Sequence, residues 1–141
     1  MLFRFLTEEI GVLDRELQAW HAESEVSRRL AAIPGVGVIT ATAIVATVTD
    51  PDKFRSGRQF AAWLGLTPQQ HSTGGKTRLT GISKQGDRYL RRLLVVGATA
   101  VMRHAKNRPT PMTDWVNELL EKKPFRLVSV ALANKDRKSG V

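Results

Sequence analysis

The chain has 141 residues, enough for one domain, and its 42% apolar content is enough to form a core. It contains no cysteine, which excludes disulfides, thiolate metal sites and a cysteine nucleophile, and its three scattered histidines do not suit a zinc site. We therefore expect no metal or cofactor in this chain. No apolar run is long enough for a membrane span or a signal peptide, so we expect a cytoplasmic protein.

The charge is strongly basic and unevenly distributed. Net charge is +9, yet residues 1–33 carry four basic and six acidic side chains. This leaves 18 basic and 7 acidic side chains for residues 34–141. An excess of this size suits a polyanionic partner, and it favours nucleic acid over a surface that is merely well solvated.

The first predicted element is one long helix over residues 7–32. Thr7 is its predicted N-cap, and two glutamates follow in the first turn. Apolar residues then recur every three or four positions as a narrow seam: Leu6, Ile10, Leu13, Leu17 and Trp20. Such a seam is typical of a coiled coil and predicts a homo-oligomer formed through this helix. Packing of the helix on its own domain is the alternative.

A proline–glycine turn follows the first helix. Pro34 ends the helix, and a small apolar helix begins after Gly37. This arrangement resembles a helix-hairpin-helix motif, in which backbone amides at a helix N-terminus bind a phosphate. The predicted DNA-binding residues of the turn are Gly35, Val36 and Gly37. An ordinary connection between two helices is the alternative.

The rest of the chain predicts further helices and one long loop. Capping or proline residues mark the expected helix starts: Ser56, Ser83 or Asp87, Thr110 and Pro124. Residues 69–82 are polar and without periodicity, which predicts a loop. The fold is therefore predicted to be all-α. Residues 1–29 are expected to form a coiled-coil-like helix. Residues 30–135 are expected to form a helical DNA-binding domain that contains the helix-hairpin-helix, and residues 136–141 a disordered tail.

Six basic side chains and a single acid, Asp87, lie between positions 76 and 92. The basic residues are Lys76, Arg78, Lys84, Arg88, Arg91 and Arg92. Arg88, Arg91 and Arg92 are expected to share one face of a helix. The cluster predicts phosphate contacts, each of which steepens the salt dependence of binding.

The loop also carries a hydroxyl beside two glycines and a lysine. It does not match a P-loop, because Gln70 stands where the first glycine of that motif belongs. A serine that attacks a phosphodiester needs neutralised charge and a proton acceptor. Lys76, Arg78 and the amides of Gly74 and Gly75 suit the first need, and His71 suits the second. From the residues alone, an ordinary loop remains the alternative.

Five segments in order resemble the C-terminal domain of the IS110/IS116/IS902 transposases. They are Ile33–Ala41, Phe54–Pro68, Ser72–Lys76, Gly81–Arg91 and Ala131–Lys135. The resemblance implies DNA transposition and site-specific recombination through a covalent serine–DNA link, with a guide RNA in some members. By motif, the nucleophile is Ser72. Ser83 is the other candidate, although helix capping is enough to explain it.

The resemblance also implies an N-terminal RuvC-like domain whose acidic tetrad binds Mg²⁺. The chain has no room for that domain, and its last residues depart from the family's continuing helix. We therefore expect a fragment, a truncated gene or a relic of one that does not cleave DNA in isolation. The alternative to a transposase part is a non-catalytic helix-hairpin-helix module that binds DNA or RNA or forms dimers.

Overall fold

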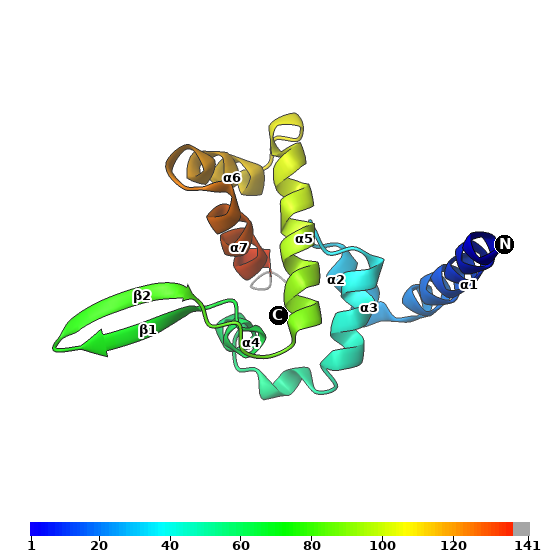
Figure 1. Ribbon diagram of the computed structural model, residues 1–141, viewed down its shortest axis with the longest axis horizontal. Helices are drawn as coiled ribbons and strands as arrows, with labels where there is room; N and C mark the ends of the chain where they lie inside the picture. The colour runs from blue at the N-terminus through cyan, green and yellow to red at the C-terminus, as the bar shows by residue number, and fades with distance from the viewer. Residues whose placement is uncertain (137–141) are drawn as a thin grey trace.

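The computed structural model describes residues 1–136 and is mostly helical, as predicted (Figure 1). Its α-helices are α1 (Leu2–Glu23), α2 (Glu25–Ala31), α3 (Val38–Thr47), α4 (Gly57–Leu64), α5 (Arg88–His104), α6 (Pro111–Lys122) and α7 (Phe125–Asp136). Two 3₁₀ turns, η1 (Pro51–Lys53) and η2 (Ala105–Asn107), and two strands, β1 (Pro68–Thr73) and β2 (Lys76–Ile82), complete the fold. Within residues 1–136, no helix is long and apolar enough to cross a membrane. The tail predicted at 136–141 lies outside the described residues except for Asp136, which ends α7.

The prediction of one helix over 7–32 is wrong at its start and in its middle. The helix begins at Leu2, and Thr7 lies inside it, where its Oγ1 donates to the carbonyl of Phe3 at 2.8 Å. The helix breaks at Ser24, which has an extended backbone and caps α2 by accepting a hydrogen bond from the Ser27 amide. His21 Nδ1 lies 2.7 Å from the buried Ser27 Oγ and stabilises the bend. A serine N-cap inside the segment therefore outweighs the continuous apolar seam.

Helix α5 lies at the centre of the helical body, with α3 on one side and α7 on the other (Figure 1). Its buried residues recur every fourth position: Leu90, Leu94, Ala98 and Met102. The predicted start at Asp87 is confirmed, because its Oδ1 accepts a hydrogen bond from the Leu90 amide at 2.8 Å. Thr110 is confirmed as the start of α6 by a capping box, and Pro124 directly precedes α7. These local signals place the helices that form the core.

The prediction of a loop at 69–82 is wrong, because this segment forms an antiparallel hairpin. Pro68 pairs with Ile82 and Thr73 with Lys76, and a bulge lies between Pro68 and Gln70. Gly74 and Gly75, with φ of +60° and +76°, form the two-residue turn. Both faces of the hairpin are open to solvent, so the strands show none of the apolar alternation that marks a half-buried strand.

Candidate nucleic-acid interface on a projecting hairpin

The hairpin projects from the helical body, at the opposite end of the molecule from α1 (Figure 1). Every residue from 69 to 81 is exposed. Among the described elements, the principal contact of β1 is with β2. The hairpin therefore has no core of its own, and its outer part is free to enter a groove or to lie along a strand of nucleic acid.

The strand register divides the side chains between two faces. Ser72 pairs with Thr77, while His71 pairs with Arg78 and Thr73 with Lys76. Paired residues share a face, and neighbours along a strand alternate between faces. Ser72 and Thr77 therefore form a hydroxyl face, and the opposite face carries His71, Thr73, Lys76 and Arg78.

This register separates groups that the sequence analysis had placed together. Lys76 and Arg78 lie next to Ser72 in the hairpin but point to the other face. His71, the predicted proton acceptor, also belongs to that face. Thr77 faces Ser72 across the ribbon and was not among the predicted residues, because its partner depends on the pairing.

The base of the hairpin is anchored in the helical body through backbone groups. The amide of Ser83 donates to the carbonyl of Thr67 at 2.9 Å, and the amide of Lys84 donates to the carbonyl of Gly65 at 3.1 Å. The Ser83 hydroxyl accepts a hydrogen bond from the Gln85 amide at 3.5 Å. Ser83 thus lies in the turn before α5, and its predicted helix-capping role belongs to Asp87 instead.

The six predicted phosphate-binding cations differ in their surroundings. Five of them are exposed: Lys76, Arg78, Lys84, Arg88 and Arg92. Arg91 is half-buried, and its Nη1 donates to the carbonyl of Leu64 at 3.0 Å and to that of Gln85 at 3.2 Å. Two of the exposed five lie on the outer part of the hairpin, one at its base and two on the first turns of α5, so they form a basic region that extends from the start of that helix along the hairpin.

The turn between α2 and α3 is largely occupied by contacts within the fold. Gly35 has a φ of +87° and packs against Gly97 of α5 so closely that a Cβ on Gly97 would collide with the Gly35 carbonyl. Val36 is buried, and its amide donates to the carbonyl of Ile33 at 3.0 Å. Gly37 is exposed and is the N-cap of α3. Of the three predicted residues, Gly37 is thus the one that is open to a ligand.

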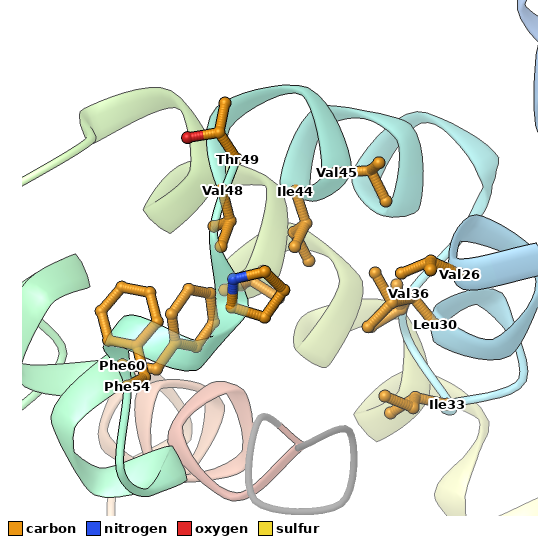
Figure 2. A pocket seen from close by; sticks show the side chains of 12 residues that line it. Val26, Leu30, Ile33, Val36, Ile44, Val45, Val48, Thr49, Phe54 and Phe60 are labelled. Atoms are coloured by element: carbon orange, nitrogen blue, oxygen red, sulfur yellow. The ribbon is translucent and has the colours of Figure 1, made fainter. Parts of the chain in front are cut away.

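An apolar pocket of about 360 Å³ lies between α2, α3 and α4 (Figure 2). Its lining includes Val26, Leu30, Ile44, Val48, Phe54 and Phe60. Thr49 supplies the only side-chain hydroxyl among its lining residues, so the pocket offers no group for proton transfer or for binding an anion. In residues 1–136, no three His, Asp or Glu side chains are placed to hold a metal ion.

Asn134 is a site-supporting residue whose role the sequence analysis missed. Its Nδ2 donates to the carbonyl of Leu66 at 3.1 Å, which joins α7 to the segment that leads into β1. The sequence does indicate that this position matters, because Asn134 lies in one of the five segments that resemble the transposases. Its partner is 68 positions away, which no local pattern indicates.

The comparisons with known proteins agree with these segments. Residues 27–112 match the family described as Transposase IS116/IS110/IS902 family. A probable family 20 transposase of Pseudomonas aeruginosa is 49% identical over 131 residues, which are 93% of this chain and 39% of that protein. The transposase for insertion sequence element IS1111A of Coxiella burnetii is 43% identical over 129 residues, which are 92% of this chain and 35% of that protein.

A more distant relative, the pilin gene-inverting protein of Moraxella bovis, is 29% identical over 103 residues, which are 70% of this chain and 32% of that protein. The chain thus spans well under half of the length of the curated relatives described here. The family match itself includes the Ser72 hairpin and the first helical turns of α5. On this evidence, the chain belongs to the IS116/IS110/IS902 family of transposases.

Proposed function

We propose that this chain is the DNA-binding C-terminal part of a transposase and that Ser72 is its nucleophile. The observation that carries the proposal is the position of Ser72 on an exposed hairpin with two exposed cations on its outer part and three more at its base and on the adjoining turns of α5. A duplex or single strand that lies against these cations has its phosphates beside the hairpin. In keeping with this function, the names of the relatives describe transposases and a pilin gene-inverting protein.

In the proposed reaction, the Ser72 oxygen attacks a DNA phosphorus atom and displaces one of its bridging oxygens. A serine–phosphate ester forms as one strand bond breaks, and the displaced oxygen leaves as the new strand end after taking up a proton. The proton of the serine must pass to a base. His71 belongs to the other face of the hairpin, so we propose that the base is not His71 and that it lies outside the hairpin.

The residues that the structure describes do not supply a metal site for this step. The family resemblance implies Mg²⁺ held by an acidic tetrad, but residues 1–136 offer no group of three suitable ligands. The residues present therefore do not fit such an ion. We propose that the isolated chain binds DNA, or an RNA of similar backbone charge, without cutting it.

The test of the nucleophile uses a full-length relative in which the Ser72 hairpin is present. Ser72→Ala is expected to abolish the covalent protein–DNA adduct, measured by denaturing gel electrophoresis with labelled DNA, because no other atom replaces Oγ. Ser83→Ala is the matched control and is expected to leave adduct formation within about a factor of three, an allowance for small packing changes at a surface serine. An adduct that survives Ser72→Ala and disappears in Ser83→Ala would assign the nucleophile to Ser83 instead.

We further propose that α1 joins copies of the chain. None of its 22 residues is buried, and several large apolar side chains are exposed, among them Phe3, Phe5, Ile10 and Leu13. Leaving such a stripe in water is unfavourable, and pairing it with a second stripe removes that cost. This surface is the observation that favours an oligomerisation role alongside DNA binding.

Light scattering tests the role of α1. The chain is expected to show a mass of at least twice 15.6 kDa at micromolar concentrations, and the double substitution Ile10→Glu with Leu13→Glu is expected to return it to that monomer mass. Arg15→Glu changes a charge on the same helix away from the seam and serves as the control. A monomer in the unsubstituted chain, or association that survives the double substitution, would contradict the proposal.

A further inference from the structure

The position of Ser72 relative to the helical body depends on the two ends of the hairpin. All residues from 69 to 81 are exposed, and β1 and β2 contact mainly each other. Among the described residues, no side chain of the body holds the outer hairpin in place. The direction of the ribbon must therefore be set by residues 64–67, which lead into β1, and by residues 83–87, which follow β2.

Arg91 contacts both of these ends with one nitrogen. Its Nη1 donates to the carbonyl of Leu64, before β1, and to the carbonyl of Gln85, after β2. Arg91 belongs to α5, whose neighbouring residues Leu90 and Leu94 are buried in the core. The guanidinium thus connects both ends of the ribbon to the most central helix of the fold.

The packing of backbone on backbone leaves little freedom at this base. A Cβ on Gly65 would collide with the backbone of Gln85, and a Cβ on Gly86 would collide with the carbonyl of Trp63. The two segments therefore touch directly, without side chains between them. The Arg91 hydrogen bonds lie where this contact meets α5, and the Asn134 hydrogen bond to Leu66 adds a connection to α7.

We propose that Arg91 is a positioning residue that fixes the direction in which the hairpin presents Ser72, and that it is not a phosphate contact. The link to catalysis rests on the proposed role of Ser72. Ser72 lies five positions after Thr67, an arm of roughly 17 Å in an extended strand, so a rotation of about 10° at the base displaces the hydroxyl by about 3 Å. A displacement of about 1 Å is enough to slow an oriented reaction by about 10²-fold.

The experiment measures the direction of the hairpin without relying on strand cleavage. The chain has no native cysteine, so spin labels at Thr73→Cys on the hairpin and Val96→Cys on the exposed side of α5 form a unique pair. Double electron–electron resonance is then compared between the parent, Arg91→Met and the matched control Arg92→Met. The control removes the same charge from an exposed neighbour on the same helix.

Arg91→Met is expected to widen or shift the distance distribution by about 3 Å, as the arm length implies, while Arg92→Met leaves it unchanged. The salt dependence of DNA binding is expected to respond in the opposite way. Arg92→Met is expected to reduce the magnitude of the slope of log affinity against log salt by about 1. Arg91→Met is expected to leave that slope within about 0.3 of the parent value. A parental distance distribution in Arg91→Met, or a loss of slope equal to that of Arg92→Met, would overturn the proposal.

If circular dichroism shows that Arg91→Met is unfolded, Arg91→Lys decides the question. Lysine retains the charge, but its nitrogen falls about one bond short of the Nη1 position, so a broadened distribution with an unchanged salt slope is expected. A parental distribution in folded Arg91→Lys would overturn the proposal. Neither readout requires a nucleophile. An adduct that survives Ser72→Ala would thus refute the proposed function while leaving the positioning role intact.

Discussion

Alanine at Gly86 is expected to lower the free energy of unfolding by about 2–5 kcal/mol, the sum of a left-handed backbone penalty and an overpacking penalty. Gly86 has a φ of +84°, a conformation that a Cβ disfavours. The added Cβ would also meet the carbonyl of Trp63, which belongs to the backbone and cannot rotate away. Residues 63–65 and 84–86 must therefore separate, and this weakens the base of the hairpin.

Gly74 provides the matched control for this prediction. Its φ is +60°, but a Cβ there would meet nothing within 4 Å. Gly74→Ala is therefore expected to cost at most the conformational penalty of about 1–2 kcal/mol. Chemical denaturation followed by tryptophan fluorescence measures both variants. Equal losses in the two variants would mean that the close approach at Gly86 contributes nothing beyond its backbone conformation.

Most of the helical fold could be predicted because its signals are local. Asp87, Thr110 and Ser56 each cap a helix by accepting a hydrogen bond from an amide three residues further on. Such bonds need no tertiary contact, so residue type and spacing are sufficient to place them. The same reasoning applies in retrospect to Ser24, whose capping bond to Ser27 is just as local and was overlooked because the apolar seam continues past it.

The hairpin could not be predicted from periodicity, for a physical reason. Alternation of apolar and polar residues arises when one face of a strand is buried, and both faces of residues 69–81 are exposed. What did indicate the turn was the pair Gly74–Gly75, which suits a two-residue connection between antiparallel strands. Without the alternation, glycines in a polar segment are equally typical of a loop.

The sequence names candidate residues for the site but not their geometry. The family segments make Ser72 the candidate nucleophile, and the charge pattern makes the basic residues candidate phosphate contacts. The separation of Ser72 from His71 depends on the strand register, which exists only once the strands pair. Arg91 looks like its basic neighbours in the sequence, because its two carbonyl partners lie 27 and 6 positions away. A pattern of charges cannot distinguish a guanidinium that binds the backbone from one that faces solvent.

The salt dependence of DNA binding tests the basic region as a surface. If the five exposed cations each contact a phosphate, the slope of log affinity against log salt is about −4.5 for a duplex. Affinity is then expected to fall by about 5 × 10²-fold between 50 mM and 200 mM salt, measured by fluorescence anisotropy with the purified chain. A chain whose basic residues were merely solvated would bind weakly at both concentrations.

A comparison of two double variants distinguishes a defined surface from net charge alone. Lys76→Gln with Arg78→Gln removes two cations from the hairpin, and the magnitude of the slope is expected to drop by about 2. Lys122→Gln with Lys123→Gln removes the same charge from exposed residues at the end of α6 and is expected to leave the slope within about 0.5 of the parent. Equal drops in both variants would mean that DNA responds to the overall charge of +9 and not to the hairpin. A drop confined to the hairpin variant would place phosphates against β2, on the face of the hairpin opposite the Ser72 hydroxyl.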